Sequence, residues 1–148
     1  MYGDTLVMRR RAAQLREQGE DIRTMAEKLV THSDEVDWSG RAADAMRQRV
    51  RDRASHLREV ANAHDTAAAS LDKHLGECDR LAESITGIER RASTLAADAR
   101  TRIARVQTTG SDADGVRPTP TREDQVLAAF SPPPPGHKDW LHVELPGL

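Results

Sequence analysis

This sequence has few aromatic residues and no large excess of charge of one sign. Apart from histidine, the only aromatic residues are Tyr2, Trp38, Phe130 and Trp140. A compact sheet or an enzyme core usually needs more of them, because aromatic side chains supply large buried areas. The 22 basic and 24 acidic side chains leave a formal net charge of −2. This balance argues against nucleic acid as the main partner, since phosphate binding needs a strong positive excess.

Disulfides and long apolar runs are absent as well. Cys78 is the only cysteine, so no disulfide can form within the chain. Residues 1–11 contain no apolar core of a secretory signal peptide. No apolar run approaches the roughly 18 residues that cross a bilayer. We therefore expect no membrane-spanning segment, and any secretion would have to use a route that reads a folded or helical signal.

The distribution of proline divides the chain into three parts. Residues 1–106 contain no proline, and residues 107–136 contain six of the seven. We predict a helical domain over 1–106, a flexible Pro-rich linker over 107–136 and a short apolar docking segment over 137–148. Within the linker, TREDQVLAAF predicts a short helix, with Thr121 and Asp124 placed as a capping box.

The first 36 residues carry two rows of residues at helical spacing. Large apolar residues recur every seven positions and small residues follow each of them by four. This pattern predicts a helix whose seam alternates large and small side chains, which lets a neighbouring helix approach closely. The large residues are Met8, Leu15, Ile22, Leu29 and Val36, and the small ones are Ala12, Gly19, Ala26 and Ser33.

A longer stripe follows, and its steps alternate between four and three residues. It predicts one helix from about residue 41 to 106, on the order of 100 Å long, with a left-handed supercoil. A break near Gly76 or Gly87 is the alternative and would give three helices. The stripe comprises Met46, Val50, Arg53, Leu57, Val60, His64, Ala67, Leu71, His74, Cys78, Leu81, Ile85, Ile88, Ala92, Leu95, Ala99, Arg102 and Val106.

The two helical patterns are separated by a short link that contains Trp38, Ser39 and Gly40. A short link makes two helices antiparallel neighbours. We therefore predict an all-α fold, an antiparallel helical hairpin of coiled-coil type with a long second helix and a Pro-rich C-terminal tail. Ser39 or Asp37 can cap the second helix, and Trp38 can cover the end of the hairpin. With equal rise on both helices, facing residue numbers should sum to about 77, so that Met8 faces Ala69.

Trp38-Ser39-Gly40, placed in a tight link between two amphipathic helices, resembles the motif of the WXG family of type VII (ESX) secretion. The longer stretch WSGRAADAMRQRVRDRASHLREVANAHDTAAASLDKH is similar to the N-terminal secretion-signal domains of actinobacterial polymorphic toxins. The likeness covers residues 4 to about 106. It departs from the family at two points. No tyrosine follows Tyr2, so the family's Tyr-xxx-Asp/Glu export signal is missing in its usual form, and the chain is longer than the compact family members, through both its second helix and its Pro-rich tail.

The resemblance implies a non-enzymatic, protein-binding helical module that acts as a homodimer or heterodimer. As a secretion substrate or targeting partner of a type VII system, it would bind a second Trp-X-Gly protein or a second copy of itself, and the secretion machinery. It would be secreted without a classical signal peptide, or be cytoplasmic before export. Two alternatives remain open: a cytosolic chaperone or adaptor for a cognate secreted helical protein, and a structural coiled-coil protein unrelated to secretion.

No residue pattern indicates catalysis or a cofactor. His74 and Cys78 are spaced to share one helix face, as two zinc ligands would, but only one thiolate is available and no carboxylate joins them nearby. We interpret them as residues tolerated at a helix seam. The arginines between residues 47 and 58 are interrupted by Asp52, which favours a solvated helix face over a phosphate-binding surface.

Two surfaces are predicted to contact other elements. The first helix is too short to cover the end of the long stripe, so we expect a partner interface at Cys78, Leu81, Ile85, Ile88 and Leu95. A third helix folding back is the intramolecular alternative. In the tail, apolar and polar residues alternate, which predicts a docking segment formed by Trp140, Leu141, Val143 and Leu145. This segment would add an extended strand to a partner, fold back on the chain, or stay loose.

Overall fold

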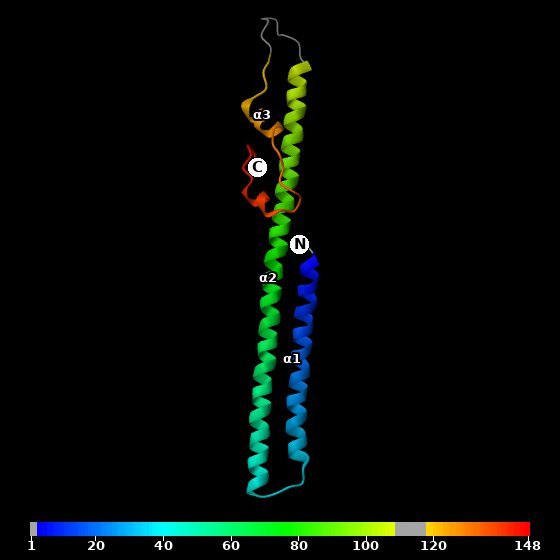
Figure 1. Ribbon diagram of the computed structural model, residues 1–148, viewed down its shortest axis with the longest axis vertical. Coiled ribbons are helices and arrows are strands. Elements are labelled where there is room, and N and C mark those ends of the chain that lie inside the picture. Colours follow the sequence, from blue (N-terminus) through cyan, green and yellow to red (C-terminus); the bar gives the residue numbers. More distant parts are fainter. Residues whose placement is uncertain (1–2, 109–117) are drawn as a thin grey trace. The chain divides into compact units, whose positions relative to one another are not determined.

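The computed structural model describes residues 3–108 and 118–148 of the chain. They form α1 (Gly3–Glu35), α2 (Arg41–Thr108), α3 (Arg122–Ala128) and one turn of 3-10 helix, η1 (Lys138–His142), with no strand among these residues (Figure 1). The predicted all-α hairpin is confirmed. Because α2 runs unbroken through Gly76 and Gly87, the broken-helix alternative is excluded.

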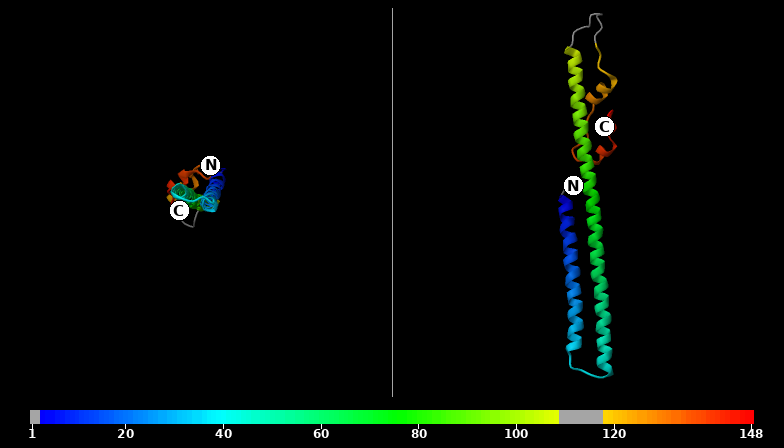
Figure 2. Two further views of the ribbon diagram at one scale, coloured as in Figure 1. Left: turned by 90° about the horizontal axis from the view of Figure 1, so that it is seen from below. Right: turned by 180° about the vertical axis from the view of Figure 1, so that it is seen from behind.

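The described chain divides into two compact units, residues 1–78 and 79–148. The boundary lies inside α2, well before residue 106, the predicted end of the helical domain. The first unit is the hairpin, in which α1 and the N-terminal part of α2 lie side by side in every view (Figures 1 and 2). The second unit contains the rest of α2 and the C-terminal residues 118–148.

Small residues hold the two helices of the hairpin together. On α1, Ala12, Gly19 and Ala26 are buried, as predicted, while the large residues beside them are only partly buried or exposed. A Cβ added to Gly19 would lie 3.2 Å from the Ala61 carbonyl oxygen, so the backbones approach closely there. We call two sets of residues the contact rows: Ala12, Gly19 and Ala26 on α1, and Ala54, Ala61 and Ala68 on α2.

Half of the predicted seam of α2 is wrong by one residue. Ala54, Ala61, Ala68 and Leu75 are buried, whereas Arg53, Ala67 and His74, each one position earlier, are exposed and Val60 is only partly buried. The close approach of α1 selects alanine, because a larger side chain would push the helices apart. The stripe of the sequence analysis is therefore rotated away from α1.

The predicted pairing register is also wrong. A sum of 77 would place Gly19 opposite Arg58, but Gly19 lies against Ala61 and Asp65, three to seven residues further along α2. The predicted register assumes equal rise on both helices. Residues 37–39 of the link are not helical, and the pairing is therefore shifted along α2. Arg47, in the second turn of α2, consequently reaches the Val36 carbonyl.

In the second unit, the C-terminal residues pack on α2. Trp140 is buried with Ile85 and Ala92, and Leu127 of α3 is buried as well. Thr121 caps α3, its hydroxyl accepting a hydrogen bond from the Asp124 backbone N–H over 3.1 Å, as the capping pattern predicts. The Asp124 carboxylate does not complete a capping box, because it binds Arg102 of α2.

The predicted linker, residues 107–136, falls into three parts. Residues 107–108 end α2, residues 109–117 lie outside the described structure, and residues 118–136 include α3. Of the three alternatives for the following segment, adding a strand to a partner, folding back on the chain and staying loose, the structure shows folding back. It forms η1, where Trp140 is buried and its indole N–H donates to the Pro134 carbonyl over 3.0 Å. The alternating apolar residues lie on a 3-10 turn followed by extended chain. An alternating pattern alone cannot distinguish this arrangement from a strand.

Candidate protein-binding surface

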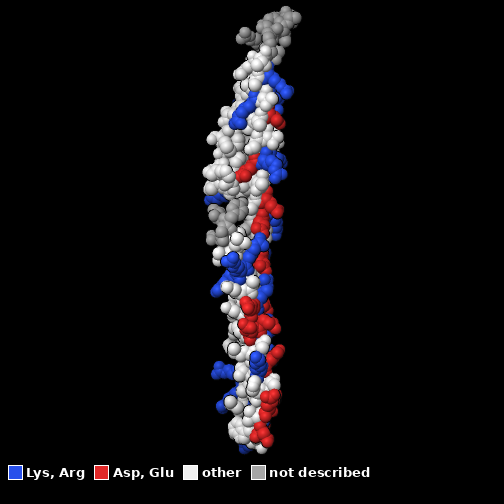
Figure 3. Space-filling model, turned by 90° about the vertical axis from the view of Figure 1, so that its right-hand side faces the viewer, with Lys and Arg blue, Asp and Glu red and all other residues white. Residues whose placement is uncertain are grey.

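Ion pairs close one edge of the contact between α1 and α2. Arg16 pairs with Asp72 and Arg23 pairs with Asp65, and each of these four residues lies four positions after a residue of a contact row. The hydrogen bond that Arg23 donates to the Asp65 carboxylate raises the pKa of the Arg23 guanidinium. Near the link, Arg51 pairs with Asp34 at 3.3 Å. In the lower half of Figure 3, which shows α1, acidic side chains gather toward one side of the view.

Large side chains line the opposite edge of the same contact. They lie three positions after, or four before, the residues of the contact rows, which places them about 40–60° back around each helix axis. Two antiparallel helices are related by a two-fold axis perpendicular to their common plane, so these two rows share one side of that plane. We call them the open apolar face: Met8, Leu15, Ile22 and Leu29 on α1, and Val50, Leu57, His64 and Leu71 on α2.

Nothing in the described part of the hairpin covers this face. Leu29 is 41% exposed, and the other members remain partly exposed. Each row is bordered by residues that directly precede the contact rows or the next position of their seven-residue repeat, and these residues lie still further out. We call these the rim rows: Arg11, Gln18, Met25 and His32 on α1, and Met46, Arg53, Val60, Ala67 and His74 on α2. Met25 and Met46 are at least half exposed.

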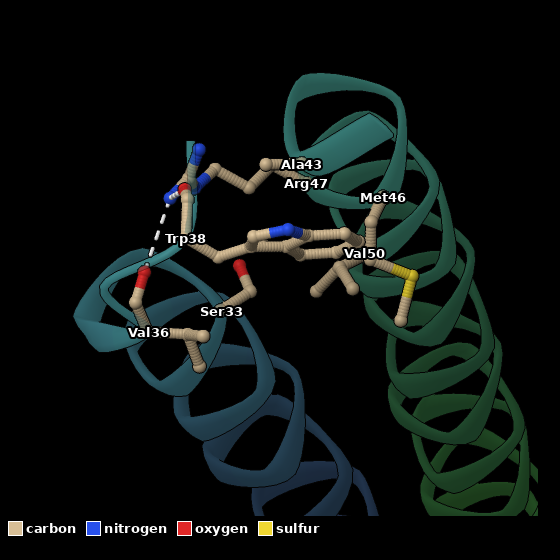
Figure 4. A pocket seen from close by; sticks show the side chains of 7 residues that line it. All are labelled: Ser33, Val36, Trp38, Ala43, Met46, Arg47 and Val50. Carbon is tan, nitrogen blue, oxygen red and sulfur yellow. Dashed lines mark hydrogen bonds between the residues drawn. The ribbon is translucent and has the colours of Figure 1, made fainter. Parts of the chain in front are cut away.

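At the link, the face ends in a hollow of about 260 Å³ formed by both helices. Its lining residues are Ser33, Val36, Trp38, Ala43, Met46, Arg47 and Val50. Figure 4 shows the Trp38 indole extending from the link toward Met46 and Val50. The ring is 50% exposed, so it covers the end of the hairpin only in part.

Arg47 organises the link from α2. Its guanidinium donates to the Val36 carbonyl over 3.1 Å and to the Trp38 carbonyl over 2.7 Å. Gly40 has φ of 100°, a conformation that L side chains rarely adopt, and its carbonyl accepts from the Asp44 N–H over 3.1 Å. The predicted caps are wrong: the side chains of Ser39 and Asp37 form no hydrogen bond with any described residue of α2. Arg47 does not replace these caps, because it donates to carbonyls of the link and leaves the first N–H groups of α2 to other acceptors.

The predicted partner interface is divided by the structure. Ile85 is buried and Ile88 partly buried against the chain's own tail, in a cluster with Trp140, Phe130 and Val143. Phe130 and Trp140 meet edge to face with ring centroids 6.1 Å apart. Leu95 lies beside Gly147, Cys78 is partly buried, and Leu81 is 51% exposed.

The predicted docking residues of the tail behave in two ways. Trp140 is buried, and Val143 and Leu145 pack partly buried against the same cluster on α2. Leu141 is 37% exposed and lies outside that cluster. Sequence reasoning missed the polar half of this docking: Arg102 donates twice to Asp124, from Nε over 2.8 Å and from a terminal nitrogen over 2.6 Å, and Glu89 accepts from the Gly136 N–H.

His74 and Cys78 are neighbours, with Nε2 and Sγ 3.6 Å apart. No group of three or more metal-ligating side chains occurs within residues 3–108 and 118–148. In the same ranges, no helix has the length and apolar character to cross a bilayer. Searches against protein-family models, curated proteins and solved structures found no match to this chain.

Proposed function

We propose that the chain is a non-enzymatic helical module that binds another helical protein, as a substrate or targeting partner of a type VII secretion system. The observation that supports protein binding is the open apolar face. Two rows of large side chains from two helices lie on one side of the hairpin, and the described hairpin leaves them uncovered. The secretion role is supported by the resemblance of Trp38-Ser39-Gly40 and its flanking helices to the WXG family.

The energetics favour a cover for this face. Fully burying a leucine, isoleucine, valine or methionine side chain stabilises by roughly 1.5–3 kcal/mol relative to exposure. The face holds seven such side chains, already partly buried, so a helical partner would gain a fraction of that amount at each. Extended apolar surfaces of this kind on soluble proteins mark interaction sites.

The test uses tagged chain in cells that naturally express it. We expect a helical protein to co-purify with the wild-type chain and to be lost from the double variant Leu15→Asp, Leu57→Asp. Val7→Asp with Ala63→Asp is the matched control, because both positions point away from the other helix, and it should keep the partner. Circular dichroism must show that both variants remain helical.

Secretion is tested separately in the same cells. The tagged chain should appear in the culture supernatant, or escort a protein that does, only when the type VII secretion ATPase is present. Export that is independent of the ATPase, with the partner still bound, would refute the secretion role and leave protein binding intact.

A further inference from the structure

We infer that the proline run of residues 132–135 is a binding surface for a protein domain whose groove is lined by aromatic side chains. The run belongs to the second unit, and this binding needs neither the open apolar face nor a helical partner, so it goes beyond the proposed function. Three features carry it: the backbone conformation of the run, the direction of its rings and the hydrogen bonds that hold it.

The run is extended because its own residues exclude the alternatives. A proline ring fixes φ at roughly −65°, and a residue that precedes proline is pushed from helical to extended ψ. Each residue from Ser131 to Pro134 precedes a proline, and all of them lie outside helices, strands and turns. Gly136 has φ of 71°, and the His137 N–H donates to the Pro134 carbonyl over 3.1 Å, which makes a type II turn. The first central residue of such a turn is also extended, so a polyproline II conformation continues through Pro135.

One edge of this left-handed helix is turned toward α2. A polyproline II helix has three residues per turn, so residues three apart lie on the same edge. Phe130 packs on the apolar cluster of the second unit, and Pro133 is the only partly buried proline of the run. Three residues later, Gly136 donates its backbone N–H to the Glu89 carboxylate over 2.5 Å. The segment between α3 and η1 accordingly lies beside α2 (Figures 1 and 2).

The other two edges of the run face solvent. Pro132, Pro134 and Pro135 are exposed. Pro132 and Pro135 are three residues apart and share one edge, whereas Pro134 lies with Ser131 on the other. The chain therefore presents exposed proline rings at the spacing Pro-x-x-Pro, which is the spacing that proline-binding domains recognise.

Hydrogen bonds hold the run through its backbone and leave these rings uncovered. The buried Trp140 donates from its indole to the Pro134 carbonyl over 3.0 Å, and the same carbonyl accepts the bond that closes the turn. Ordering a flexible ligand costs binding free energy, and a ligand already held in its bound conformation avoids much of that cost. The run is thus a preorganised ligand.

Aromatic side chains supply the chemistry that fits such a surface. A proline ring is apolar and carries no N–H, so it offers area for packing and no donor. A polyproline II backbone forms no internal hydrogen bonds, so its carbonyl groups can accept bonds from a partner. Tryptophan and tyrosine combine a large apolar ring with an N–H or O–H donor, and a groove built from them matches both features. A rigid connector would use only the restricted backbone and would gain nothing from exposed rings.

The test uses purified SH3, WW and EVH1 domains as probes, because their aromatic grooves bind proline-rich segments. The synthetic peptide FSPPPPGH, residues 130–137, selects from this panel a domain that binds it in calorimetry. We expect the full-length chain to bind that domain more tightly than the peptide does, by about threefold, because its run is already ordered.

Pro132→Ala with Pro135→Ala in the full chain should weaken binding about tenfold or more, because both rings of one edge are removed. The matched control Pro118→Ala, Pro120→Ala removes two prolines outside the run and should keep the wild-type affinity. The first pair of substitutions should weaken binding of the peptide as well. This comparison decides the case even where the double variant of the chain no longer docks its C-terminal residues.

Four results would overturn the inference. If no domain of the panel binds the peptide, the run is not a ligand for an aromatic groove. If the full chain binds more weakly than the peptide, its rings are covered. Equal affinity of the Pro132→Ala, Pro135→Ala variant, or an equal loss in the control, would assign binding to other residues. None of these results bears on the open apolar face, and Leu15→Asp with Leu57→Asp should bind the selected domain like wild type.

Discussion

The apolar row of α2 is open in the hairpin unit and covered in the second unit. In the hairpin, Leu57 and Leu71 are partly exposed at an edge that neither helix closes. In the second unit, Ile85 and Ala92 occupy the same heptad row and are buried under Trp140. Equal sequence periodicity thus produces a binding surface in one stretch and a closed core in the other, depending on whether the chain supplies its own cover.

The segment that covers this row, residues 118–148, differs in kind from a helix of a coiled coil. We call it the cover. It is built from a short helix, α3, a proline run and η1, and it fixes Trp140 by a hydrogen bond from its indole to Pro134. A proline run has few conformations to lose on ordering, which reduces the entropic cost of docking. A segment of low helical content therefore closes a row that coiled-coil rules would assign to another long helix.

Removal of the cover should have the largest effect. We expect Trp140→Ala to weaken docking of residues 118–148 by about 3–5 kcal/mol, since it empties the centre of the cluster with Ile85 and Ala92. Hydrogen exchange should then lose protection in α3 and η1, while the hairpin keeps its protection. Leu141→Ala is the control, because Leu141 is exposed, and it should leave protection unchanged. Unchanged exchange in Trp140→Ala would contradict the description of the cluster.

Widening the hairpin contact should have the next largest effect. Ala61→Leu inserts a branched side chain where α1 approaches at Gly19, and we expect a loss of about 1–3 kcal/mol of hairpin stability in thermal or urea melts. Ala63→Leu makes the same change on the exposed side of α2 and should be nearly neutral. Equal stability of the two variants would show that the contact rows do not control helix approach.

Substitution at the end of the open face should cost less. Replacing a well-buried tryptophan by alanine would cost about 2–4 kcal/mol. Because Trp38 is 50% exposed, we expect Trp38→Ala to cost about half of that or less. Its larger effect should be on partner binding, which the co-purification assay measures. A stability loss above about 3 kcal/mol would mean that Trp38 is a core residue of the hairpin.

Much of the fold followed from the sequence, because long helices without proline are governed by local spacing. The contact row of α1, the continuous α2 and the cap at Thr121 were all readable in this way. The seam of α2 was read one residue too early at half of its positions. Ala54, Ala61 and Ala68 recur every seven residues, but the larger residues beside them dominated the pattern.

The cover of the second unit was harder to predict, since its contacts join residues far apart in the sequence. Arg102 binds Asp124, Glu89 binds Gly136, and Trp140 packs on Ile85. No periodicity relates these pairs. The candidate surface was likewise reached only in part: the stripe contained Val50, Leu57 and Leu71, but only the geometry shows that α1 leaves them uncovered.

The smallest predicted effect concerns the acidity of the cover. Hydrogen bonds from Arg102, and then from Thr121, lower the pKa of Asp124. Between this lowered pKa and the ordinary aspartate value of about 3.9, the unfolded state binds more protons than the docked state. The ion pair therefore stabilises docking fully above about pH 4, and this contribution is lost as the pH falls through the lowered pKa.

Trp140 fluorescence in a Trp38→Phe background reports this directly, because Trp140 is then the only tryptophan. We expect the emission to shift to the red below about pH 4 as the buried indole becomes hydrated. Asp124→Asn should remove much of that acid response and weaken docking at neutral pH, since an amide cannot pair as a carboxylate with Arg102. Glu123→Gln removes the neighbouring, exposed carboxylate and should leave the pH profile of the parent intact. An unchanged profile in Asp124→Asn would show that apolar contacts alone hold the cover.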